Sequence, residues 1–167
     1  MNINYTAAND ILIEGVYKDE TFEIKFSDIK LYWQYATEED FEGGKAKICG
    51  KYVFANILTA NGQDGIIFVW DIEQKKVVNF YEGDYCIDFV LRNDEIYSLH
   101  YFAYWGISPY FQMRKLELKT NQSNAMMIDF PFDTDVYSGN AEIVSMSFKD
   151  DKILTICFGD NKYFVAI

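Results

Sequence analysis

The chain has 167 residues, half of them hydrophobic and 18% aromatic, which is enough to bury a core and excludes a wholly disordered protein. Its 26 acidic and 15 basic residues give a formal net charge of -11, which opposes binding to nucleic acid or to an anionic membrane. No apolar run reaches the ~20 residues that span a bilayer, and the N-terminus lacks the basic and apolar regions of a signal peptide. We therefore expect one cytoplasmic domain, residues 1–167, whose partner, if bound by charge, is basic.

Short apolar or alternating segments dominate the chain, and no long window keeps the 3.6-residue period of a helix. Turn residues such as Asn61-Gly62 and Asn93-Asp94 separate these segments. The only helical candidate is a single turn at 37–42 that begins at the capping residue Thr37. The expected strands, in chain order, cover residues 11–17, 21–26, 45–48, 52–59, 66–72, 77–81, 86–92, 95–104, 110–118, 125–130, 143–148, 153–158 and 163–167. This pattern predicts a single β-rich domain of antiparallel strands.

A faint internal repeat runs through the chain. The segments "GKYVFANI", "NDEIYSLH" and "DDKILTIC" each combine a polar turn with β-branched or aromatic residues, and Val53, Ile96 and Ile153 take the same place in them. The spacing of the first two is close to that of a propeller blade, about 40–45 residues. Residues 9–26 and 150–167 also share one layout of turn, strand, charged turn and strand. The repeat predicts a series of similar small sheets.

The run "IIFVWDIEQKK", residues 66–76, is apolar up to Trp70-Asp71 and then turns through charged residues. At residues 68–72 it resembles the third strand of a blade in WD-repeat β-propellers. The resemblance implies a strand that is buried on both faces, which would explain why the run does not alternate. We expect a partial or small β-propeller-like array of antiparallel strands, either open or closed through a homodimer, with a β-sandwich or barrel as the alternative.

The sequence carries no motif for catalysis or metal binding. The sole histidine, His100, lies among aromatic residues, and no nucleophile elbow is present to pair with it. The segments "DTDVYSGNAE" and "NGQDG" imitate parts of calcium loops but lack the full series of ligands. The three cysteines occur in no CxxC spacing and are typical of buried, reduced thiols. We expect no enzymatic activity, no cofactor and no bound metal.

Acidic and aromatic residues instead gather in segments that we expect to be loops. Tyr and Trp provide large, rigid contact areas, and carboxylates accept charge-assisted hydrogen bonds from Lys and Arg. Such loops suit a basic protein partner, although core packing is an alternative for both Trp33 and Trp105. The candidate partner-binding residues are Trp33, Tyr35, Glu38, Glu39, Asp40, Glu82, Asp84, Tyr85, Trp105, Tyr110, Asp133, Asp135 and Tyr137.

In size, acidity and lack of catalytic motifs the chain resembles the small, fold-diverse immunity proteins of bacterial toxin–immunity pairs, including those of contact-dependent growth inhibition. The resemblance implies a cytoplasmic protein that binds and neutralises a basic toxin, most concretely a nuclease, by occluding its active site. Two alternatives remain open. One is a propeller-like scaffold that presents strand edges or a groove to peptides, and the other is an enzyme or small-ligand pocket near His100.

Overall fold

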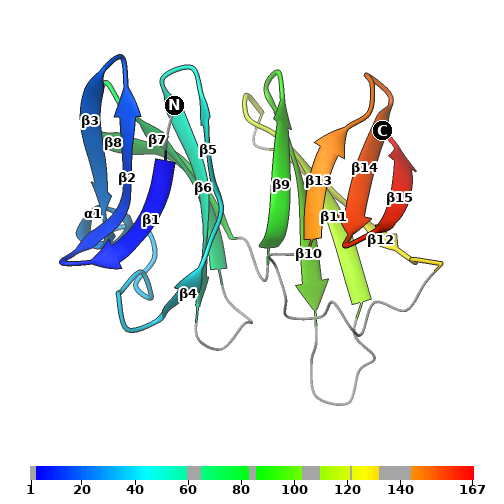
Figure 1. Cartoon of the computed structure of the whole chain (residues 1–167), viewed down its shortest axis with the longest axis horizontal. Helices are drawn as coiled ribbons and strands as arrows, with labels where there is room; N and C mark the ends of the chain where they lie inside the picture. The colour runs from blue at the N-terminus through cyan, green and yellow to red at the C-terminus, as the bar shows by residue number, and fades with distance from the viewer. Residues whose placement is uncertain (1–2, 60–64, 83–85, 103–109, 121, 132–143) are drawn as a thin grey trace. The chain divides into compact units, whose positions relative to one another are not determined.

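The computed structural model describes residues 3–59, 65–82, 86–102, 110–120, 122–131 and 144–167. As the sequence predicts, these residues form almost entirely antiparallel β-structure, with one short helix (Figure 1). The chain divides into two compact units, Met1–Asp84 and Tyr85–Ile167, which we call the first and the second unit. Within the described ranges, no helix has the length and hydrophobicity needed to cross a bilayer.

The first unit contains two antiparallel sheets (Figure 1). The smaller sheet has the strand order β1-β2-β3, and the larger has the order β4-β6-β7-β8, with β5 also paired to β6. A short helix, α1 (Phe26–Lys30), follows the smaller sheet. The strands are β1 (Ile3–Ala8), β2 (Ile11–Tyr17), β3 (Glu20–Lys25), β4 (Phe41–Gly43), β5 (Ala46–Cys49), β6 (Tyr52–Thr59), β7 (Gly65–Asp71) and β8 (Lys76–Glu82).

The core of the first unit is filled by one face of each sheet and by α1. Phe26 and Ile29 stand three residues apart in α1, so both side chains reach the core on the same side of the helix. Strand β7 is buried along its whole length, as expected from its unbroken apolar run. Phe68 belongs to the core cluster, and its neighbour Val69, which points to the opposite face, is also buried.

The second unit repeats this construction with its own core. Its larger sheet has the order β12-β11-β10-β9, and its smaller sheet has the order β13-β14-β15 (Figure 1). The buried Asp88 joins the two sheets, because its Oδ2 accepts a hydrogen bond of 2.7 Å from the backbone N–H of Met146. The strands are β9 (Cys86–Arg92), β10 (Glu95–Phe102), β11 (Tyr110–Glu117), β12 (Gln122–Ile128), β13 (Val144–Phe148), β14 (Ile153–Phe158) and β15 (Asn161–Ala166).

The predicted repeat corresponds to a real structural repeat. Val53, Ile96 and Ile153 each lie at or beside the start of the second strand of a hairpin, in β6, β10 and β14. The segments 9–26 and 150–167 also share their layout in the structure, as the hairpins β2–β3 and β14–β15. Each of the four sheets is thus built from strands that follow one another along the chain.

The single turn predicted at 37–42 forms at its start, but it is not helical. The Thr37 Oγ1 does accept a hydrogen bond from the backbone N–H of Asp40 at 3.1 Å, as a helix cap would. The turn then leads directly into β4, so the cap at Thr37 closes one turn and no helix follows. The helix forms at Phe26–Lys30 instead, where the first residue had been assigned to a strand, and β1 and β4 were not predicted.

Candidate functional site

The structure brings five of the predicted partner-binding residues together, and these lie between α1 and β4 in the first unit. Tyr110 begins β11 in the second unit, where its ring stacks on Phe102 with centroids 4.9 Å apart. Glu82 ends β8. The five that lie together are Trp33, Tyr35, Glu38, Glu39 and Asp40. Those outside the described residues are Asp84, Tyr85, Trp105, Asp133, Asp135 and Tyr137.

A chain of backbone hydrogen bonds fixes the segment that follows α1. The N–H of Trp33 donates to the carbonyl of Ile29 at 3.1 Å, and the N–H of Ala36 donates to the carbonyl of Trp33 at 3.0 Å. Ala36 is buried and anchors the segment, while Trp33 is half-buried and packs against the core. Tyr35 remains 48% exposed, with its ring 5.8 Å from that of Trp33. Trp33 therefore combines core packing with support of the exposed Tyr35.

An exposed apolar surface lies beside this segment, and sequence reasoning missed it. The Tyr32 ring, two residues beyond α1, packs on the Phe80 ring of β8 with centroids 5.3 Å apart. Both rings remain more than 40% exposed, and the neighbouring Leu31 is 83% exposed. We call Leu31, Tyr32, Val78 and Phe80 the α1–β8 surface. The sequence did place Phe80 in a predicted strand. Its contact with Tyr32 could be found only in the folded structure.

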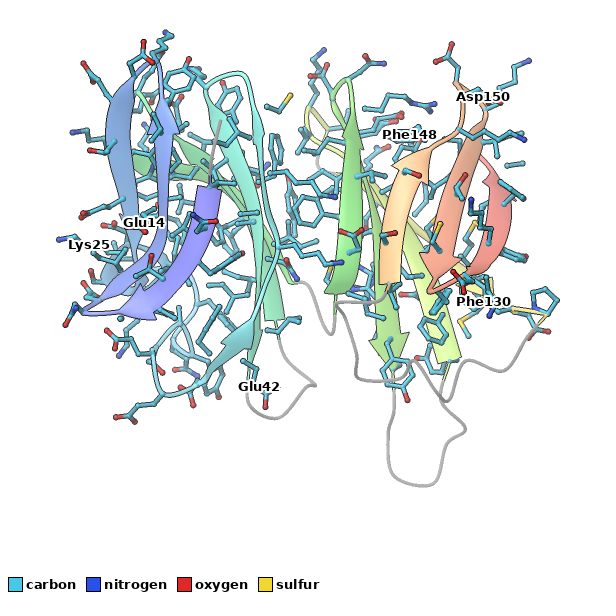
Figure 2. All side chains as sticks on the ribbon, viewed as in Figure 1. Glu14, Lys25, Glu42, Phe130, Phe148 and Asp150 are labelled. Carbon is cyan, nitrogen blue, oxygen red and sulfur yellow. The ribbon has the colours of Figure 1, made fainter. Side chains whose placement is uncertain are left out.

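Some carboxylates between α1 and β4 accept hydrogen bonds from the protein itself, and others are free to meet a partner. The Glu38 Oε1 accepts a hydrogen bond from the backbone N–H of Asp10, and the Thr37 hydroxyl donates to the Asp40 Oδ2 at 2.6 Å. Glu39 is exposed, and so is Glu42, whose side chain points outward from β4 (Figure 2). Glu39 and Glu42 are therefore the carboxylates best placed to meet a partner.

An open cavity of about 540 Å³ adjoins the segment. Its walls come from the turn before β2, from α1 and from the acidic segment, and they include Phe26, Glu39 and one basic residue, Lys30. Asp10 holds one wall in place, because its carboxylate accepts hydrogen bonds from the Ser27 N–H at 3.1 Å and from the Ser27 hydroxyl at 2.6 Å. Residues 31–42 include no Lys or Arg. The region thus combines negative charge, a hollow and exposed aromatic rings.

A second cavity, of about 520 Å³, lies at the turns of the larger sheet in the second unit, and its charges are largely paired. Lys115 lies 2.5 Å from a carboxylate oxygen of Glu95, and Arg92 donates to the backbone carbonyl of Asp151 at 2.5 Å. The hydrogen bond from Lys115, followed by that from Tyr97, lowers the pKa of Glu95. These internal ion pairs leave less net charge for a partner than the acidic segment offers.

The buried His100 lies close to one serine. Its Nε2 is 2.8 Å from the Ser98 Oγ, and both side chains are enclosed within the protein. Cys86 is buried, as expected of a small apolar side chain, whereas Cys49 is exposed, contrary to the prediction. Among the residues that the structure describes, no group of three or more His, Cys, Asp or Glu side chains is placed to hold a metal ion.

Comparison of the chain with protein-family models, with curated proteins and with solved structures gives no match. Exposed aromatic rings suit the apolar stems of Lys and Arg, while carboxylates beside them suit the charged ends of those side chains. The arrangement around residues 31–42 can bind cationic groups without any covalent step.

Proposed function

We propose that this protein is a cytoplasmic immunity protein that binds a basic toxin, most concretely a nuclease, and occludes its active site. The observation that carries the proposal is the placement of the α1–β8 surface beside an acidic segment that has no basic residue. A nuclease cleft must be positively charged to bind the phosphate backbone, so it complements such a surface. The proposed role requires binding alone.

The two parts of the surface have different tasks in this proposal. The carboxylates of Glu39 and Glu42 raise the rate of encounter with a basic partner, because opposite charges steer association at low ionic strength. The rings of Tyr35 and Phe80 hold the complex together, since aromatic side chains that become buried at an interface dominate its affinity. Charge therefore acts mainly on the association rate, and the aromatic anchors act mainly on the dissociation rate.

The test is a titration of the protein against the product of the adjacent gene, where that product carries a basic C-terminal domain, by calorimetry and stopped-flow at two salt concentrations. We expect one-to-one binding, with an association rate that falls at least about tenfold between low and physiological salt. Phe80→Ala should weaken binding by about 10- to 100-fold, mostly through faster dissociation. Phe164→Ala is the matched control, because Phe164 is an exposed aromatic residue on a strand of the second unit.

The two parts of the proposal fail separately. An association rate that is the same at both salt concentrations would exclude the electrostatic part. Equal losses of affinity in Phe80→Ala and Phe164→Ala would exclude the α1–β8 surface as the contact. Absence of binding at micromolar concentrations, together with binding of short uncharged peptides, would favour the propeller-like scaffold that presents strand edges.

A further inference from the structure

Among the residues that the structure describes, strand β12 forms an edge of the larger sheet in the second unit, and none of them protects this edge from pairing with another strand. Strand β12 pairs with β11 in unbroken register over its whole length. Its sequence, QSNAMMI, contains no charged residue and no proline. The side chains of Gln122 to Met127 are all exposed, including Met126 at 46% and Met127 at 57%. Natural sheets normally protect a long edge with charges, bulges, prolines or a covering element.

Other edge strands in the described parts of the chain are protected or irregular. Strand β1 is neutral like β12, but its register with β2 shifts between Tyr5 and Ala8. Strand β3 has two glutamates and a lysine, and β15 has Lys162. The register of β8 with β7 shifts near Trp70, and the ring of Tyr32 packs against β8. The backbone N–H of Met146 in β13 is bonded to the Asp88 carboxylate. Strand β12 differs from these edges in being long, regular and neutral.

We propose that β12 pairs with β12 of a second copy of this chain, in antiparallel orientation, and so joins two larger sheets into one. A neutral edge favours this occupant, because two chains of net charge -11 repel one another least where no charged side chain faces the other copy. The two-fold symmetry of the commonest homodimers brings identical strands together in this antiparallel way. With full overlap of the strands, Ala125 faces Ala125 of the partner copy across the axis.

The charges that flank β12 are complementary in this orientation. Lys119 lies in the turn before the strand, where it also pairs with Asp94, and the exposed Asp129 follows the strand. Antiparallel pairing places Asp129 of each copy near the Lys119 end of the other. Parallel pairing would instead place the two Asp129 carboxylates together. The ends of the strand therefore select the antiparallel arrangement.

A small cavity supports the same edge as a contact. It has a volume of about 190 Å³, and β12 contributes Ala125 and Met126 to its walls, opposite Ile167 at the chain terminus. Beyond β12, the ring of Phe130 packs on Phe158 with centroids 4.7 Å apart, which fixes the end of the segment. A second β12 would extend the sheet past Met126 and cover this hollow.

The test measures the mass of the whole protein by sedimentation velocity across the micromolar range, where small interfaces dissociate. The wild type should sediment at twice the chain mass of 19.5 kDa at the upper end of the range. Ala125→Glu and Ala125→Lys each place like charges face to face, so each variant alone should dissociate at least about tenfold more readily. An equimolar mixture of the two should regain the double mass, because the opposite charges then meet.

Ser147→Glu and Ser147→Lys are the controls, because Ser147 is an exposed small residue on β13 and the charge change is the same. Both controls should keep the wild-type mass, and thermal unfolding should show that all four variants are folded. A wild type that remains monomeric throughout the range overturns the proposal. A dimer that persists in both Ala125 variants, or that is not restored in their mixture, overturns it as well.

Discussion

Asp71 shows how a single side chain fixes a hairpin. Its carboxylate is fully buried at the end of β7, where Oδ1 accepts hydrogen bonds of 2.9 Å from the backbone N–H groups of Glu73 and Gln74. Its Oδ2 lies 2.7 Å from the Lys51 Nζ. Desolvation alone would raise the pKa of Asp71, but the Lys51 ammonium and the two backbone donors outweigh it and lower the pKa. Asp71, at the end of the apolar run of β7, thus has a structural role in this turn.

Replacing Asp71 should destabilise the protein in a pH-dependent manner. Asp71→Ala leaves two backbone donors without their acceptor, and we expect a loss of about 2–4 kcal/mol at pH 7. Because the folded pKa lies below the ordinary value of 3.8, the carboxylate stabilises the fold above that pH, and this stability is lost as the pH falls through the folded pKa. Urea denaturation at pH 7 and at pH 3 checks the prediction.

Glu73→Gln is the matched control for that measurement. Glu73 lies in the same turn, but its side chain is exposed and pairs with Lys18 at 2.9 Å. Exposed pairs of this kind contribute little, so Glu73→Gln should unfold at nearly the wild-type urea concentration. A loss for Asp71→Ala that is as large at pH 3 as at pH 7 would show that the charge of Asp71 contributes nothing.

At the scale of elements, the two sheets of the first unit are joined by a close approach of backbones at Gly44. The Tyr5 hydroxyl of β1 lies 3.1 Å from the Lys45 carbonyl and 2.5 Å from the Asn56 carbonyl, so it links β1 to the strands of the other sheet. A Cβ at Gly44 would lie 2.1 Å from the Asn56 carbonyl oxygen and 2.7 Å from the Tyr5 oxygen. The joint therefore has no room for any side chain at this position.

Gly44→Ala should separate these elements and cost about 1–3 kcal/mol of unfolding free energy, because the obstructing atom belongs to the backbone and cannot rotate away. Gly50→Ala is the control: Gly50 has a φ of +59°, but its Cβ would meet nothing within 4 Å. That variant carries only the strain of a left-handed backbone, about 1 kcal/mol. Denaturant titration of both should rank Gly44→Ala as the less stable, and the reverse order would contradict the close approach.

The elements also show where sequence reasoning succeeds and where it stops. The bounds of β2, β6, β9 and β14 were predicted correctly, because turn residues on both sides confine a short apolar run. The sequence also predicted that residues 31–40 lie outside the strands, because this segment is rich in charged residues and has no alternating apolar pattern. The contact between Tyr32 and Phe80 was not, since it joins residues far apart in the chain. Nor could the sequence reveal that Asp40 is engaged by the hydroxyl of Thr37 within its own turn.

At the scale of the whole molecule, the excess of negative charge acts on both stability and binding. Acidic residues outnumber basic ones by 26 to 15, so many carboxylates have no cation to balance them. Ion pairs such as Lys18 with Glu73 lie at the exposed surface, where such pairs contribute little. A net charge of this sign would steer the basic partner proposed above, but it also destabilises the compact state through self-repulsion.

Added salt should therefore stabilise this protein at pH 7. Raising sodium chloride from about 20 mM to about 500 mM shortens the Debye length and screens the repulsion, so we expect the Tm to rise by about 2–5 °C. The control is the same comparison near the isoelectric point of about 4.4, where the net charge vanishes and the rise should disappear. A Tm that falls with salt at pH 7 would mean that attractive pairs outweigh the net repulsion. The net charge would then not lower the stability of the fold, and its proposed role in binding would not reduce stability.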